Sequence, residues 1–143
     1  MNIKAQCCSL KLAIKLKDLG VKQDSLFWHI ETPYMYHPQS DGTTVTQYKW
    51  VIGNPFALNA DMKNCYSAFT ASELLELLPK FIGEYFIVVL PGLQKYWNIK
   101  YVDSEYTPRR VYPYVYCTHK NLCNALAIML IHLIENKLIE MPK

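Results

Sequence analysis

The first periodic segment of the chain lies between residues 9 and 19, and its apolar positions fit either a strand or a helix. One set of apolar residues alternates, as in a strand, whereas another recurs every three or four residues, as on one face of a helix. The helical set is Cys8, Leu12, Leu16 and Leu19. We favour a helix because Leu, Ala and Lys are strong helix formers and because Gly20 supplies a C-terminal cap.

Two segments with strong β propensity follow, at residues 26–36 and 43–52. The first is rich in aromatic residues and contains Pro33, which is tolerated in an edge strand or at a bend. Asp41 and Gly42 lie between the two segments and supply a turn in which glycine can adopt a positive φ. The pattern predicts a β-hairpin with a long loop.

A second helix is marked by a capping box, in which Thr70 and Glu73 satisfy free backbone N–H groups reciprocally. Apolar residues then recur at helical spacing as far as Phe81. Pro79 cannot continue a regular helix, so we expect the helix to end near Leu78, after two to three turns.

Three strands are predicted next, at residues 84–90, 96–102 and 111–117. The first is continuously apolar, which is typical of a strand buried on both faces. The second alternates, with Trp97 on one side and Lys100 on the other. Short connections indicate an antiparallel meander, and Pro113 indicates an edge or a bulge in its last strand.

The chain closes with a predicted helix at residues 119–138, capped by Thr118. Apolar residues cover nearly its whole circumference between positions 122 and 134, so it must be buried on more than one side. The element order is α-β-β-α-β-β-β-α. We therefore predict one α+β domain over residues 1–143, with a small, mostly antiparallel sheet of about five strands packed by three helices.

The composition is that of a globular chain with few charges. Residues of the AVILMFWYC class make up 51% of the chain and charged residues 19%, below the usual share of about 25%. The longest apolar run, at 125–134, is too short to cross a bilayer, and no secretory signal precedes it, so we expect a cytoplasmic protein. The five cysteines have no zinc-ligand spacing, which predicts reduced thiols and no metal.

The net charge of +3 comes from the first 22 residues, which carry five lysines against Asp18. This excess is one helix wide, whereas a nucleic-acid footprint needs a broader basic surface. Single-stranded nucleic-acid binding is an alternative, because basic and aromatic residues interleave on adjacent predicted strands. These residues are Lys95, Tyr96, Trp97, Lys100, Arg109, Arg110, Tyr112 and Tyr114.

Signatures of catalysis and metal binding are weak. His29 and Glu31 share a strand face and His37 follows, so a metal site is one interpretation, but a solvated strand face is the simpler one because the spacing matches no known motif. His132 is interpreted as a core or interface histidine. No phosphate-binding or hydrolase motif occurs, so an enzyme, the least favoured interpretation, would use a site without a motif. We predict no cofactor.

Three stretches resemble a family of small uncharacterised proteins carried by bacterial phages and integrated elements: residues 65–79 (CYSAFTASELLELLP), 96–99 (YWNI) and 121–135 (NLCNALAIMLIHLIE). That family implies no activity for any residue. The last third, with strands at 85–90 and 96–102, a Leu-Pro-Gly turn at 90–92 and a helix opened by Thr118, is also similar to antitoxins of HicB type. That similarity implies sequestration of a partner protein.

The low charge, the many tyrosines and the apolar final helix favour a non-enzymatic protein-interaction module that self-associates or covers a partner's surface. We expect the outer face of the final helix to make the contact. Its candidate interface residues are Leu122, Leu126, Met129, Leu130 and Leu133.

Overall fold

The structure is a computed structural model that describes residues 3–55, 64–103 and 111–140. Its α-helices are α1 (Leu10–Asp18), α2 (Ala71–Leu77) and α3 (Leu122–Glu135), and η1 (Ile3–Ala5) and η3 (Leu93–Lys95) are short 3-10 helices. The strands are β1 (Trp28–Pro38), β2 (Thr44–Gly53), β3 (Cys65–Ser67), β4 (Phe81–Ile82), β5 (Tyr85–Pro91), β6 (Trp97–Asp103) and β7 (Val111–His119). The predicted α+β class with three α-helices is confirmed over these residues.

The strands form two antiparallel sheets, where the sequence predicts one. The first has the order β2-β1-β3 and the second the order β4-β5-β6-β7. Two short strands, β3 and β4, were not expected, because they have three and two residues and depend on their partners rather than on local propensity. The predicted hairpin is β1-β2, and the predicted meander is β5-β6-β7.

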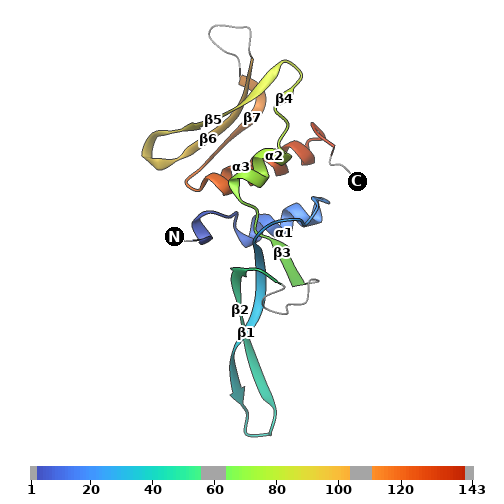
Figure 1. Cartoon of the computed structure of the whole chain (residues 1–143), viewed down its shortest axis with the longest axis vertical. Helices are drawn as coiled ribbons and strands as arrows, with labels where there is room; N and C mark the ends of the chain where they lie inside the picture. Colours follow the sequence, from blue (N-terminus) through green and yellow to red (C-terminus); the bar gives the residue numbers. More distant parts are fainter. Residues whose placement is uncertain (1–2, 56–63, 104–110, 141–143) are drawn as a thin grey trace.

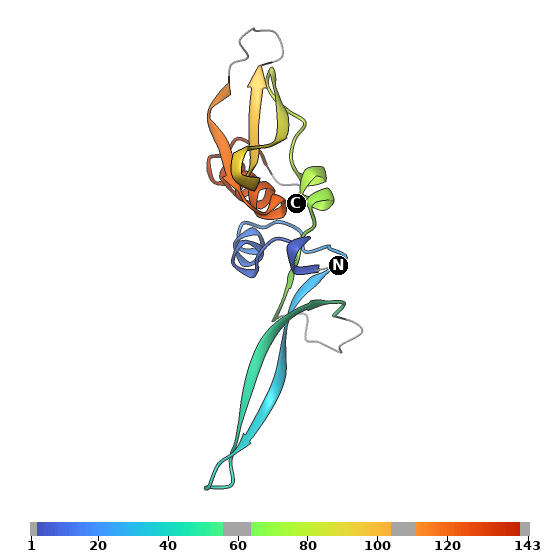
Figure 2. The ribbon, with the colours of Figure 1, turned by 90° about the vertical axis from the view of Figure 1, so that its left-hand side faces the viewer.

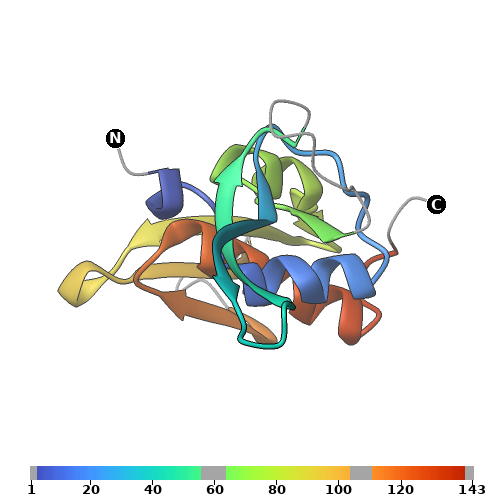
Figure 3. The ribbon, with the colours of Figure 1, turned by 90° about the horizontal axis from the view of Figure 1, so that it is seen from below.

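The three helices lie between the two sheets, and the β1-β2 hairpin extends away from them at one end of the molecule (Figure 1). A view turned by 90° shows the same arrangement, with the four-stranded sheet at the opposite end from the hairpin (Figure 2). Seen from below, the hairpin points toward the viewer, in front of the helices (Figure 3). The molecule therefore consists of a packed body and a long projection.

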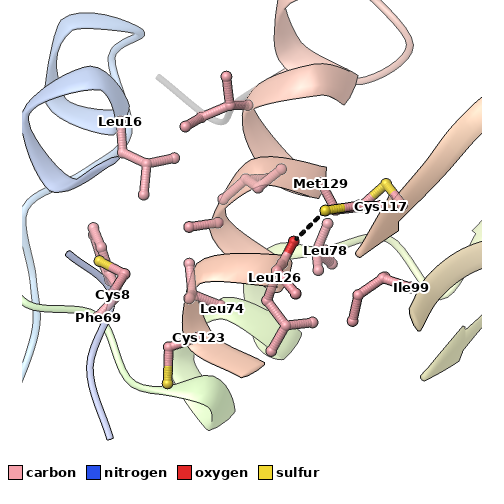
Figure 4. Packing of buried hydrophobic residues seen from close by; sticks show 14 of the residues in the cluster. Cys8, Leu16, Phe69, Leu74, Leu78, Ile99, Cys117, Cys123, Leu126 and Met129 are labelled. Atoms are coloured by element: carbon pink, nitrogen blue, oxygen red, sulfur yellow. Dashed lines mark hydrogen bonds between the residues drawn. The ribbon is translucent and has the colours of Figure 1, made fainter. Parts of the chain in front are cut away.

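Helix α3 lies at the centre of the body (Figure 4). Leu16 of α1 approaches it from one side, and Ile99 and Cys117 of the four-stranded sheet approach it from the other. The Cys117 thiol also donates a hydrogen bond of 3.3 Å to the carbonyl oxygen of Ala125. The apolar circumference of the sequence is thus explained by burial on both sides, within the same chain.

The ends of α1 and α2 agree with the local signals, whereas the final helix, predicted over residues 119–138, extends only from Leu122 to Glu135. Gly20 has a φ of 83°, and the N–H groups of Gly20 and Val21 bond to the carbonyl oxygens of Lys17 and Leu16, which closes α1 in a Schellman motif. The capping box of Thr70 and Glu73 is confirmed at the start of α2. Helix α3 differs from the prediction.

The residue that caps α3 is Asn121, whereas Thr118 was expected. Strand β7 continues to His119 by pairing with β6, so Thr118 is still extended and cannot begin a helix. The Asn121 side chain accepts a hydrogen bond of 2.9 Å from the N–H of Asn124 and donates one of 3.0 Å to the Ala5 carbonyl oxygen. It therefore also ties the N-terminal segment to α3.

Strand β5 is covered on one face, whereas its apolar sequence predicted burial on both. Tyr85, Ile87 and Val89 pack against the main core, and all residues of β5 are half-buried or exposed. The strand register places the alternate residues on the opposite face, together with Phe81 of β4. The four-stranded sheet thus has an inner face toward α3 and an outer face.

Candidate functional site

The projecting part of the hairpin, residues 31–49, is called the arm below. Strands β1 and β2 pair from Trp28 opposite Gly53 to Pro38 opposite Thr44, whereas β3 pairs with β1 only from Trp28 to Ile30. Beyond Ile30 the described residues contain no third strand of this sheet. A two-stranded ribbon is only marginally stable in water by itself.

The tip of the arm is closed by a turn that the sequence predicts. Gly42 has a φ of 81°, and the N–H of Gln39 donates a hydrogen bond of 2.7 Å to the Thr43 carbonyl oxygen. The Asp41 carboxylate accepts hydrogen bonds from the hydroxyl of Thr43 at 2.6 Å and from its N–H at 2.9 Å. These bonds lower the pKa of Asp41, so the exposed tip carries a negative charge.

The register of the two strands divides the arm into two faces, because residues opposite one another share a face. A bulge between Pro33 and Met35 leaves Tyr34 as the extra residue. Its hydroxyl donates to Gln47 Oε1 at 2.8 Å, and Lys49 Nζ lies 5.5 Å from its ring centre, so Tyr34 lies on the face of these two residues.

We name each face after a central residue. The Met35 face consists of Thr32, Tyr34, Met35, His37, Val45, Gln47 and Lys49. The Tyr36 face consists of Glu31, Pro33, Tyr36, Pro38, Thr44, Thr46 and Tyr48. Neither face of the arm is packed against the two hydrophobic clusters of the body, whose members include no residue of the arm.

Large apolar side chains on both faces of the arm are open to solvent. Their exposed fractions are 47% for Tyr34, 42% for Met35, 64% for Tyr36, 49% for Val45 and 57% for Tyr48. Several exposed apolar residues gathered on one projecting element are typical of contact surfaces on soluble proteins. The arm is therefore the candidate functional site.

The charge of the arm distinguishes between classes of partner. Only Glu31, Asp41 and Lys49 are charged within residues 31–49, and there is no arginine. A nucleic acid would need several cationic contacts to phosphate. A nearly neutral surface of Tyr, Met, Val and Thr suits contact with protein, where Tyr and Met are enriched and charges are depleted.

The residues expected to bind a single-stranded nucleic acid are divided by the four-stranded sheet. Trp97 packs against the core on the inner face, whereas Lys100 lies opposite Tyr116 on the outer face. Lys95 is exposed in η3. Arg109, Arg110 and the side chain of Tyr112 lie outside the described residues.

The residues of α3 that were expected to contact a partner are buried inside the folded protein. Leu126, Met129, Leu130 and Leu133 are at most 1% exposed, and Leu122 is half-buried. They are covered by the four-stranded sheet, α1 and α2. These side chains therefore offer no surface to a second protein in this structure, because residues 10–18 of the same chain cover the face we assigned to a partner.

The three residues considered for a metal site are not brought together. His29 is buried, and its Nε2 lies 2.9 Å from the Cys8 carbonyl oxygen, to which the neutral ring donates. His37 lies eight residues further along β1, about 27 Å at the usual rise per residue, and beyond the bulge. Within residues 3–55, 64–103 and 111–140 no group of three or more potential metal ligands occurs.

An open pocket of about 700 Å³ lies beside the first turn of α2. Its charged residues are Glu73 and Glu76. Burial raises the pKa of Glu73, but hydrogen bonds from Thr70, Leu26 and Ser25 outweigh it, and the net pKa is lowered. The Glu73 carboxylate is thus occupied in joining α2 to the segment before β1, which is a structural role.

The five cysteines are all buried, without disulfides. Burial raises the pKa of Cys7 to about 11 and that of Cys8 to about 12. The Cys123 thiol donates a hydrogen bond of 3.0 Å to the Gln6 carbonyl oxygen. Neutral, inaccessible thiols are poor nucleophiles, so the structure indicates a packing role for Cys7 and Cys8.

Comparison with protein-family models, curated proteins and solved structures finds no match for the chain. Among the helices of the described residues, none combines the length and the apolar character needed to span a membrane. The arrangement defines an α+β protein with a packed body and a projecting β-arm.

Sequence reasoning predicted the hairpin but missed its exposed apolar residues. The available signal was the run Tyr34-Met35-Tyr36, in which consecutive residues are large and apolar. A strand that packs one face on a core alternates apolar with polar residues. Loss of that alternation next to two prolines indicates a ribbon that presents apolar groups on both sides.

Proposed function

We propose that this protein is a non-enzymatic protein-interaction module and that the arm is its contact surface. The observation that carries the proposal is the exposure of Tyr34, Met35, Tyr36, Val45 and Tyr48 on a two-stranded ribbon that leaves the body. Such a ribbon gains stability when a partner covers it.

The chemistry of the arm supports a protein partner. Tyrosine supplies a large contact area and a hydroxyl for hydrogen bonding, at a low cost in side-chain entropy. Methionine adapts its shape to the opposing surface. The proposal moves the expected contact from the final helix, which is internal, to the hairpin, and it keeps both self-association and partner sequestration as modes of action.

Photo-crosslinking tests this function. A photoreactive amino acid is placed at Met35 or Tyr36 in the cells from which the gene comes, and at Leu93 as a control, because Leu93 is 90% exposed but lies in η3. We expect crosslinked adducts of discrete mass from the arm positions, to this chain or to another protein, and none from Leu93. Absence of adducts from both arm positions would contradict the proposal.

A further inference from the structure

We propose that the partner of the arm is the arm of a second copy of this chain, packed antiparallel through the Met35 face about a two-fold axis. This inference rests on the proposed function and names its partner. In such a pair the central Met35 lies near its own counterpart, and the two bodies lie at opposite ends.

Charge complementarity supports the antiparallel arrangement. Lys49 lies near the base of the arm, opposite Thr32, whereas Asp41 lies in the turn at the tip. The arm is about 34 Å long at the usual rise per residue. When two arms overlap along this length in opposite directions, the base of each meets the tip of the other. Each Lys49 then faces an Asp41, and the symmetry forms this contact twice.

The same argument selects the face. Glu31 lies at the base on the Tyr36 face, and Lys49 lies at the base on the Met35 face. Antiparallel packing through the Tyr36 face would bring Glu31 toward Asp41 of the second copy, and like charges in contact oppose association. Packing through the Met35 face avoids this repulsion and adds attraction.

The size of the contact predicts its strength. The Met35 face presents seven side chains, fewer than the 20–30 residues per partner of a standard interface. The dimer therefore belongs to the transient class, and we expect reversible association with a Kd of about 10–100 µM.

A charge-exchange experiment tests the arrangement by sedimentation equilibrium at low salt. The variants are Lys49→Glu and Asp41→Lys, each of which places like charges together in both contacts of its own homodimer. We expect the wild-type chain to dimerise and each variant to bind itself about tenfold more weakly or worse. An equimolar mixture restores both contacts in a heterodimer, so it should associate with nearly the wild-type Kd.

The mixture separates charge pairing from damage to the turn, because a variant misfolded at Asp41 could not be rescued. Met35→Asp places two carboxylates near the two-fold axis and should abolish the dimer, whereas Tyr48→Asp, on the other face, should leave the Kd within about twofold.

Three results would overturn the inference. They are a wild-type monomer up to about 1 mM, a mixture that associates no better than its components, and a stronger effect of Tyr48→Asp than of Met35→Asp. In each case, photo-crosslinks from the arm to a different protein would leave the proposed function standing.

Discussion

At the scale of single residues, His29 links the stability of the body to pH. His29 is 6% exposed, and burial lowers its pKa below the usual value of about 6.5, although the hydrogen bond to the Cys8 carbonyl opposes this shift. The unfolded chain therefore takes up this proton at a higher pH than the folded protein does. His29 leaves the free energy of unfolding unchanged above about pH 7 and lowers it as pH falls from about 6.5 to the folded pKa.

The variant His29→Gln should flatten this dependence, because glutamine keeps an N–H donor for the Cys8 carbonyl oxygen but does not titrate. Urea unfolding at pH 7, 6 and 5.5 measures the effect. His37→Gln, on the arm, is the matched control and should follow the wild type. An equally steep fall in stability for His29→Gln would show that another group is responsible.

At the scale of elements, the arm and the body should be separable. Thr32 lies opposite Lys49, so the sixteen residues between them can be replaced by Asn-Gly, which joins paired strands in a two-residue turn. Because neither hydrophobic cluster contains a residue of the arm, the free energy of unfolding should change by less than about 1 kcal/mol.

This comparison requires protein concentrations at which the wild type is monomeric, because a dimer gains apparent stability by mass action. The shortened chain should also lose all concentration dependence of its melting temperature. A loss of more than about 3 kcal/mol would show that the arm is part of the folded core.

At the scale of the whole molecule, α3 joins the parts of the body, since it contacts α1, α2 and the four-stranded sheet. Leu130 is fully buried in it, so Leu130→Ala should cost about 2–5 kcal/mol. Hydrogen exchange should accelerate in α1 and in β6 alike. Leu122→Ala, the same change at a half-buried position of the first turn, should cost clearly less. Equal costs, or faster exchange on one side only, would contradict the central role of α3.

The local features of this protein follow from interactions between residues that are close in the sequence. The capping box of Thr70 and Glu73, the stop at Gly20 and the turn at Asp41-Gly42 each depend on residues within five positions of one another. The antiparallel order of the last three long strands likewise follows from their short connections. Such local interactions form irrespective of how the rest of the chain packs, so the sequence alone predicts them.

Which apolar surfaces are covered depends on how the whole chain packs. The sequence of α3 requires burial on several sides. It does not specify whether α1 of the same chain or a second protein covers the side away from the four-stranded sheet. Likewise, the hairpin pattern does not show that, among the described residues, β3 pairs with β1 only from Trp28 to Ile30, so that Tyr34 to Tyr48 extend beyond it as a two-stranded ribbon. Coverage depends on contacts between residues far apart in the chain, and these are set by the competition of all apolar faces for one core.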